Sequence, residues 1–365
     1  MAKKRGTCGL CLVIIIILLL WLAWPFFNPS IESNLSHQMH GKLTGQDAIS
    51  DSTVYGVGGT DLGIIVKHNG QYCLLFGDTF SSTTSMTGNW RSNTMAISED
   101  TDPSDGITID SWILEPGTPF AKELISSLKV DNVEMTCIPT TAVSLNGNLY
   151  VYYMSVRHWS ITGGVWTCNN ASVAVSVDNG QTFSKMTNIS WDGDGNFVLF
   201  GAVQPFSESD DYLYLLSTPA GRFGSCYLSR VEPSQILNIS AYGYFSDISS
   251  SDEITWSSEV SDASPTFSSP VGEVSVMWND YLSKWTAFYT DNEAFSIVMR
   301  TSDHLWGPWS EPHTIVDADE YPSLYGSYVH PDFVENEGEI VYFIMSVFSQ
   351  YNTFVMSVNV SSLAI

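Results

Sequence analysis

The chain has 365 residues, and its 14 Lys and Arg residues are outnumbered by 39 Asp and Glu residues, which gives a formal net charge of −25. A charge of this sign excludes a nucleic-acid partner, whose phosphates the chain would repel. Aromatic residues make up 13% of the chain, a composition that suits both β-cores and carbohydrate-binding clefts.

The N-terminal segment consists of a basic start, 1–8, followed by an unbroken apolar run, 9–27. A membrane-spanning helix needs roughly 20 apolar residues, so this run predicts one transmembrane or signal-anchor helix. The positive flank stays in the cytoplasm and places the rest of the chain outside the membrane. Residues 25–29, Pro-Phe-Phe-Asn-Pro, are a poor signal-peptidase site. We therefore expect an extracytoplasmic protein, anchored by this helix or secreted if the helix is cleaved.

Residues 28–45 are predicted to be a polar spacer, and residues 46–365 the folded domain. Within that domain one pattern recurs five times: an apolar strand, a tight polar turn and an aromatic-rich strand. The paired ranges are 63–67 with 72–76, 142–145 with 149–154, 201–206 with 212–216, 274–278 with 285–289, and 332–334 with 340–345. Asn-Gly turns, as at 69–70 and 146–147, are a strong hairpin signal between such strands.

A further strand is expected after each hairpin, at 94–98, 172–176, 225–230, 296–302 and 353–358. Repeated units of this kind are typical of propeller blades. We therefore predict an all-β fold, a five-bladed β-propeller preceded by the N-terminal helix, with a β-sandwich as the alternative. Because the chain ends soon after the last of these strands, residues near 46–57 are expected to supply the outer strand that closes the ring.

Residues 176–183 match the Asp-box pattern S-x-D-x-G-x-T-W/F. This motif forms a turn between outer strands in many sialidase-like propellers. Its role there is structural, so Asp178 is not assigned to catalysis.

Polar residues at the predicted starts of the inner strands would meet at one rim of the central channel. The aligned positions are Asp61, Thr140, Gly201, Glu273 and His330. Convergence of polar groups is the usual mark of a site. Asp78 ends the strand that pairs with the first inner strand, so it would lie near Asp61. Two such carboxylates could act as acid and base on a glycosidic bond, although each could equally cap a turn.

Basic and aromatic residues after several strands suit the recognition of sugar rings and hydroxyl groups, although an Arg can equally pair with a structural carboxylate. The candidate substrate-binding residues are Trp90, Arg91, Asn93, Arg157, His158, Trp159, Arg222 and His330.

Six motifs occur in a characteristic order: GTDLG at 59–63, FGDTF at 76–80, WRSN at 90–93, YMSVRHW at 153–159, TPAGRFG at 218–224 and GPWS at 307–310. Together they resemble a family long catalogued as a domain of unknown function, with members in actinobacteria, other bacteria and phages. Some members are endo-D-arabinanases, which cut the arabinan of mycobacterial arabinogalactan and lipoarabinomannan. The likeness covers about residues 50–360.

The resemblance implies a five-bladed propeller and a glycoside hydrolase with aspartates at its site. Asp61 is then expected to be the general base and Asp78 the acid or its pKa modulator, with Glu273 as a rival acid and with inversion at the anomeric carbon. No cofactor and no metal ligand are expected, although a structural divalent ion in the channel, as in related propeller glycosidases, stays open. We expect a monomer whose partner is a polysaccharide.

Two other functions stay open at this point. A non-catalytic glycan-binding or adhesion propeller would bind a polymer without cutting it. A sialidase-like exo-glycosidase, suggested by the Asp box, would need an arginine triad, which could come from Arg91, Arg157, Arg222 and Arg300.

Overall fold

The computed structural model describes residues 34–84, 86–206, 211–248 and 254–364. In these ranges the chain is all-β, with strands β1 to β24 and six short 3-10 helices, η1 to η6, and without an α-helix. The basic start and the predicted membrane segment, 9–27, lie outside the described residues. Within them, no helix is long and apolar enough to cross a membrane.

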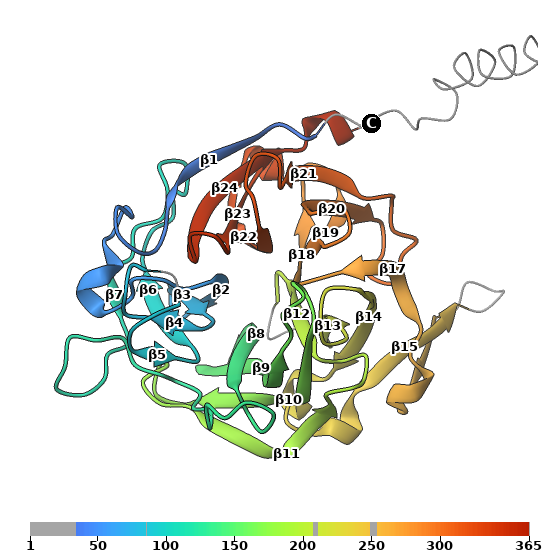
Figure 1. Cartoon of the computed structure of the whole chain (residues 1–365). Helices are drawn as coiled ribbons and strands as arrows, with labels where there is room; N and C mark the ends of the chain where they lie inside the picture. The colour runs from blue at the N-terminus through green and yellow to red at the C-terminus, as the bar shows by residue number, and fades with distance from the viewer. Residues whose placement is uncertain (1–33, 85, 207–210, 249–253, 365) are drawn as a thin grey trace, which may run out of the picture. The chain divides into compact units, whose positions relative to one another are not determined.

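The centre of the molecule is surrounded by the innermost strands of the sheets (Figure 1). These strands are β2 (Leu62–His68), β8 (Thr136–Leu145), β12 (Leu199–Gln204), β18 (Val274–Asn279) and β22 (Leu324–Glu335). Each contacts the next in this order, and β22 contacts β2, so the innermost strands form a closed cycle. The sheets radiate from this cycle in a propeller-like arrangement (Figure 1).

From each innermost strand a sheet extends outwards through antiparallel neighbours. These are β3 (Gln71–Phe76), β6 (Thr94–Ser98) and β7 (Ser111–Trp112) after β2; β9 (Asn148–Trp159), β10 (Trp166–Ser176) and β11 (Ser184–Asp192) after β8; β13 (Leu213–Thr218), β14 (Gly224–Val231), β15 (Gly243–Ile248) and β16 (Ile254–Ser257) after β12; β19 (Lys284–Asp291), β20 (Ser296–Ser302) and β21 (His313–Asp317) after β18; and β23 (Ile340–Val347), β24 (Asn352–Asn359) and β1 (His37–Lys42) after β22.

Smaller elements complete the fold. The strands β4 (Thr79–Phe80) and β5 (Trp90–Arg91) pair as a separate ribbon, β17 (Pro265–Val271) pairs with β14, and β12 pairs with β18 in parallel. The 3-10 helices are η1 (Ser52–Tyr55), η2 (Pro233–Gln235), η3 (Ile239–Ala241), η4 (Val260–Asp262), η5 (Asn336–Gly338) and η6 (Ser361–Leu363).

The Asn-Gly hairpins form where the sequence predicts them. Asn69 and Gly70 have φ values of 48° and 85°, and Asn146 and Gly147 have φ values of 51° and 75°. Positive φ at both turn residues is the requirement of a two-residue turn whose twist matches that of the flanking strands. The turn between β12 and β13 includes residues 207–210, which lie outside the described residues.

The outer strand that closes the ring is β1, whereas we expected residues near 46–57. His37 lies opposite Val358 and Lys42 opposite Phe354, so β1 is the outermost strand beside β24. Residues 52–55 form η1 instead. The strand therefore lies inside the segment predicted to be a spacer, and the compact unit begins at Asn34. Its mixed burial explains the error, because a mostly polar outer strand carries little of the alternation that marks strands in a sequence.

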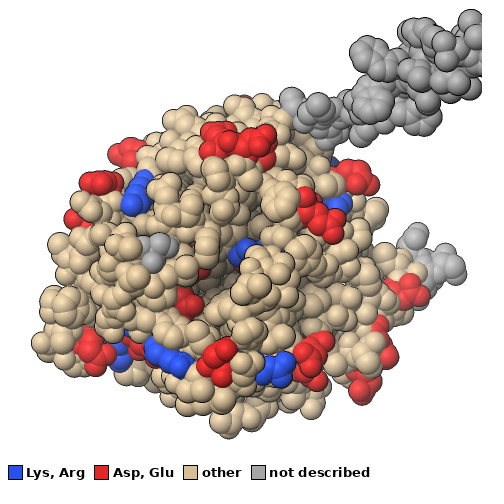
Figure 2. Space-filling view, viewed as in Figure 1, with Lys and Arg blue, Asp and Glu red and all other residues tan. Residues whose placement is uncertain are grey.

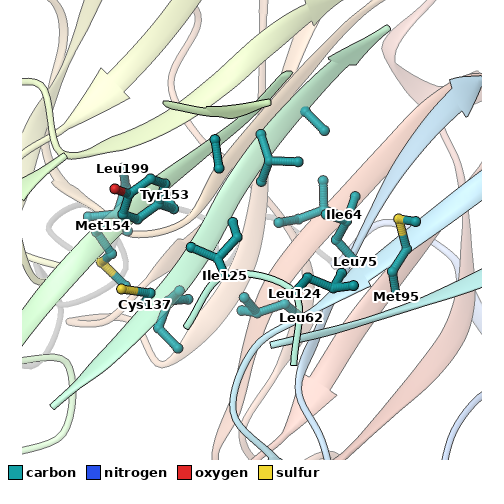
Figure 3. Close-up of a cluster of buried hydrophobic side chains, with 14 of the residues drawn as sticks. Leu62, Ile64, Leu75, Met95, Leu124, Ile125, Cys137, Tyr153, Met154 and Leu199 are labelled. Carbon is teal, nitrogen blue, oxygen red and sulfur yellow. The ribbon is translucent and has the colours of Figure 1, made fainter. Parts of the chain in front are cut away.

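The apolar core is divided into clusters that lie between neighbouring sheets. One cluster joins the β2 sheet to the β8 sheet, with Leu62, Ile64 and Leu75 facing Cys137 and Met154 (Figure 3). Because both faces of a sheet are covered in this way, its strands are apolar along almost their whole length, as in β23. This packing fixes the innermost strands, and with them the side chains at their ends.

The Asp box forms the turn between β10 and β11. Both carboxylate oxygens of Asp178 accept hydrogen bonds, from the Thr182 amide at 2.9 Å, the Thr182 hydroxyl at 2.6 Å and the Ser176 hydroxyl at 2.8 Å. These bonds stay within the turn, which supports the structural role predicted for Asp178.

Candidate active site

Asp61 lies immediately before β2, where the chain enters the central ring. Its Oδ2 atom accepts hydrogen bonds from the hydroxyl groups of Tyr325, at 2.8 Å, and Tyr351, at 3.4 Å. Its Oδ1 atom is buried, and none of the described residues donates to it. A Cβ atom on Gly77 would lie 2.4 Å from this oxygen. Any side chain at position 77 would therefore collide with the carboxyl group of Asp61.

Asp78 follows β3, two residues after the strand that pairs with β2. Its Oδ1 atom accepts hydrogen bonds from the Trp90 indole at 2.7 Å and from the Thr136 hydroxyl at 2.6 Å. The side chain is 8% exposed. Trp90 belongs to the β4–β5 ribbon and Thr136 begins β8, so two separate parts of the fold orient this carboxyl group.

The two aspartates share an environment that resists ionisation. Burial raises the pKa of Asp61 to about 7, and the neighbouring charge of Asp78 acts in the same direction. Burial also raises the pKa of Asp78 to about 7, against the hydrogen bonds from Thr136 and Trp90. Because two nearby carboxyl groups titrate as a pair, the site holds about one proton near neutral pH.

A largely buried ion pair lies near Asp61. Arg222, between β13 and β14, donates to both oxygens of Glu273, with distances of 2.7 Å, 2.9 Å and 3.0 Å. Its guanidinium carbon lies 4.5 Å from the ring centroid of Tyr325. Asp61, Tyr325, Arg222 and Glu273 therefore form one continuous chain of contacts.

The site lies at the end of the ring where the innermost strands begin. Figure 2 shows that the molecule is hollowed at its centre, with acidic and basic atoms at the wall of the hollow. A pocket in the ring is lined by Leu62, Ile138, Pro139, Thr140, Met154, Leu199, Phe200, Glu273, Val274 and Tyr328. Its wall is mostly apolar, which lowers the local dielectric constant and strengthens the electrostatic interactions of Glu273, which lines it.

Trp90 is a predicted binding residue that contacts Asp78 directly. Besides its hydrogen bond to Asp78, its ring stacks with Phe80, with 6.2 Å between the centroids and 12° between the planes. Phe80 in turn meets Tyr351 edge-on at 5.6 Å. Trp90 and Phe80 are half-buried and Tyr351 is buried, and the three rings form an aromatic wall beside the two aspartates.

Arg91 and Asn93, by contrast, serve the fold. Asn93 is 1% exposed, and its side-chain amide donates to the carbonyl groups of Ile125 and Cys137 and accepts from the amides of Leu124 and Ile125. Arg91 is buried and donates to the carbonyl of Gly56 at 2.5 Å. Neither is placed to touch a ligand in the hollow.

The predicted binding residues at the end of β9 are separated from the two aspartates by at least one other side chain. His158 pairs with the exposed Asp131 at 2.6 Å. Trp159 meets Trp166 edge-on at 5.3 Å, and Trp166 in turn lies 5.6 Å from the Arg222 guanidinium. Arg157 precedes them on the same strand. Burial raises the pKa of the Cys168 thiol, and the charge of Arg157 acts against this rise.

His330 does not share the rim with Asp61 and Glu273. It lies five residues beyond Tyr325 on β22, which at about 3.3 Å per residue places it roughly 16 Å further along the strand. There it is 4% exposed and packs against Tyr72 and Phe333. The error follows from the start of β22, which is Leu324 instead of the expected residue 332.

Tyr325, Tyr351 and Thr136 are the site residues that the sequence reasoning missed. Tyr325 and Thr136 occupy the positions wrongly given to His330 and Thr140, because β22 and β8 begin earlier than expected. Alignment of the repeats by the starts of the apolar runs, at Thr136 and Leu324, would have found them.

The arginines do not assemble the triad that a sialidase-like site requires. Arg222 is bound to Glu273, Arg91 to Gly56, and Arg300 to the Tyr289 hydroxyl and the Ser310 carbonyl. These partners lie in different parts of the ring. In the described ranges no group of three or more His, Cys, Asp or Glu residues is arranged to hold a metal ion.

The fold and the site together define a propeller-like protein with two aspartates, Asp78 buried and Asp61 partly buried, where its innermost strands begin. Residues 48–357 match the family model described as Domain of unknown function (DUF4185), and the chain belongs to this family. A relative from an Aspergillus species, notoamide biosynthesis cluster protein J, is 26% identical over 325 residues, which are 84% of this chain and 83% of the relative.

Two solved structures of glycoside hydrolases share the fold. The exo-β-1,3-galactanase of Phanerochaete chrysosporium matches with a TM-score of 0.54 and 11% identity over 90% of this chain and 65% of its own. The α-L-arabinofuranosidase of Podospora anserina matches with a TM-score of 0.51 and 11% identity over 89% of this chain and 97% of its own. At such low identity the likeness concerns the fold alone.

Proposed function

We propose that this protein is a glycoside hydrolase whose catalytic pair is Asp61 and Asp78. The observation that carries the proposal is the pair itself: two carboxyl groups largely withdrawn from water, each with a pKa raised to about 7, where the innermost strands begin. Glycoside hydrolysis needs one carboxyl group that donates a proton and one that accepts a proton or attacks. A pair that holds about one proton near neutral pH meets this need.

The surroundings of each aspartate support a division of roles. The hydroxyl groups of Tyr325 and Tyr351 donate to Asp61 and favour its ionised form, as a general base requires. The resemblance makes Asp78 the acid, and burial and the charge of Glu123 favour its protonated form against the hydrogen bonds from Thr136 and Trp90. In this mechanism Asp78 protonates the glycosidic oxygen while Asp61 takes a proton from the water that attacks the anomeric carbon.

Inversion is the outcome that we expect from this division. An inverting enzyme holds its carboxyl groups about 6.5–9.5 Å apart so that a water molecule fits beside the sugar. Glu273 is the weaker candidate for the acid, because both of its oxygens are occupied by Arg222. Its proposed role is to hold the guanidinium against Tyr325.

The proposed substrate is a furanose polysaccharide, most specifically an arabinan of the arabinogalactan or lipoarabinomannan type, cut internally. The resemblance to endo-D-arabinanases supports this choice. The two structural neighbours are named as enzymes that act on glycans, which supports a glycan substrate in general.

We also interpret the cycle of innermost strands as five blades. We propose that the protein acts outside the membrane as a monomer, anchored through residues 9–27.

The decisive experiment incubates the protein with arabinogalactan and lipoarabinomannan and separates the released oligosaccharides. Asp61→Asn and Asp78→Asn should each lower kcat by about 10²–10⁴-fold. Binding of the polymer without any cleavage by the unchanged protein would instead favour a glycan-binding propeller. Full activity in either variant would overturn the assignment of the pair.

A further inference from the structure

Residues 113–135, here called the strap, connect β7 to β8 and are tied to the two residues that follow the β4–β5 ribbon, Ser92 and Asn93. The Glu123 carboxylate accepts a hydrogen bond from the Ser92 amide at 2.9 Å, and the hydroxyl groups of Ser92 and Ser127 are 2.7 Å apart. Asn93 holds the main chain of residues 124 and 125. The strap therefore has a fixed position next to the site.

Two opposite charges of the strap lie behind Trp90. Lys129 forms an ion pair with Glu123, and its ammonium group lies 5.4 Å from the centroid of the Trp90 ring. The indole of the same ring donates to Asp78 Oδ1 at 2.7 Å. Both members of the pair are largely shielded from water, with side chains 30% and 18% exposed, so solvent screens their charges only in part.

We propose that Glu123 and Lys129 are a positioning pair that controls the protonation of Asp78 from behind Trp90. The inference rests on the proposed function, in which Asp78 is the acid. Neither residue touches the reacting atoms. Lys129 stabilises the carboxylate, Glu123 stabilises the protonated carboxyl group, and Trp90 holds the carboxyl group within reach of both charges.

The charged and titratable groups that face Asp78 come from several elements. Asp61 precedes β2, Tyr351 follows β23, and Glu123 and Lys129 come from the strap. Lys129 lowers the pKa of Asp78 and Glu123 raises it. Thr136 and Trp90 add uncharged hydrogen bonds. The strap is thus the source of the two charges outside the proposed catalytic pair that act on Asp78 in opposite directions.

The test compares Lys129→Met with Glu123→Gln in the full protein. If the pair acted only as a structural tie, both changes would break the same ion pair and have the same effect. As a positioning pair they should shift the alkaline limb of the pH–activity profile in opposite directions, by about half a pH unit or more. The limb should move up in Lys129→Met and down in Glu123→Gln, and Lys129→Arg should restore the original profile.

A second readout does not depend on activity. The indole ¹⁵N–H signal of Trp90, assigned with a Trp90→Phe variant, should report the titration of Asp78 and shift its midpoint in the same opposite directions. Lys122→Met is the matched control, because this lysine of the strap donates to the Gln181 carbonyl and should change neither profile. Shifts of the same sign, or no shifts, would overturn the inference, whereas an inactive protein with opposite indole shifts would overturn only the proposed function.

Discussion

Tyr325 donates its hydroxyl hydrogen to Asp61 Oδ2 at 2.8 Å while the face of its ring lies against the Arg222 guanidinium. The tyrosine thereby connects the proposed base, Asp61, with the Arg222–Glu273 ion pair, which its aromatic ring contacts. Its hydroxyl group also favours the charged form of Asp61. The position of this phenol group thus contributes to both the orientation and the ionisation of the carboxylate.

Removal of this hydroxyl group should impair the enzyme mainly at acidic pH. In Tyr325→Phe the pKa of Asp61 rises further, so the acidic limb of the kcat/KM profile moves to higher pH. We expect a loss of about tenfold or more at pH 6 and a smaller loss at pH 8. Tyr351→Phe is the matched control, because its bond to Asp61 is longer, at 3.4 Å. An equal or larger shift in Tyr351→Phe would contradict the assignment.

The buried charge of Asp61 should cost stability at alkaline pH. Its pKa in the folded protein, about 7, lies above the ordinary value of 3.8. Protonation therefore stabilises the fold fully below about pH 4, and this stability is lost as the pH rises through 7. Asp61→Asn removes the dependence, so the variant should be more stable than the unchanged protein by ~2–4 kcal/mol at pH 8 and equally stable near pH 4.

Urea unfolding at the two pH values measures this difference. Asp51→Asn is the control, since the pKa of this exposed carboxyl group is lowered by its hydrogen bonds to Thr53 at the start of η1. It should bring no gain in stability at pH 8. A stabilisation of Asp61→Asn that does not change with pH would refute the explanation.

A single methyl group should displace the base. In Gly77→Ala the new Cβ atom would lie 2.4 Å from Asp61 Oδ1, which forces the carboxyl group away from Tyr325. We expect kcat/KM to fall at least about tenfold while the thermal midpoint changes little, because the loss is confined to one side chain. Gly163→Ala, where a Cβ atom meets nothing within 4 Å, should be neutral in both assays. Equal effects of the two changes would argue against displacement.

His330 should matter for stability and not for binding. His330→Gln is expected to leave KM within about twofold, since the ring lies far along β22 from the aspartates. Burial lowers the pKa of His330 to about 4, so the neutral ring contributes stability above about pH 6.5 that is lost as the pH falls through 4. The variant should lose that part of the pH dependence in thermal unfolding. A tenfold higher KM in the variant would instead support the predicted position of His330 at the rim of the site.

The sequence identifies the two aspartates because each flanks an apolar strand next to a glycine, at the end of a hairpin that is itself marked by Asn69 and Gly70. It does not identify Tyr325. Pro331 lies inside β22, and because proline inside a strand argues against the assignment, the part of the strand before it is hard to recognise from the sequence. A bulge between Val329 and Val334 accommodates the proline in the structure.

The partners of the candidate site residues are not predictable from one sequence either. Arg222 and Glu273 are both visible as candidates, yet their ion pair exists only because the pairing of β12 with β18 brings the segments before β14 and β18 together. The same holds for Lys129, which belongs to no motif and comes close to Trp90 through the strap, a segment in which the structure describes no strand.

The pairing of β1 with β24 has a consequence for biosynthesis. Ribosomes make residues 37–42 among the first of the compact unit and residues 352–359 among the last, so β1 must wait without a partner while nearly the whole chain is synthesised. Unpaired strands invite aggregation when they are apolar. The polar sequence HQMHGK of β1 is suited to that delay, because it can remain hydrated until the last strand emerges and receives it.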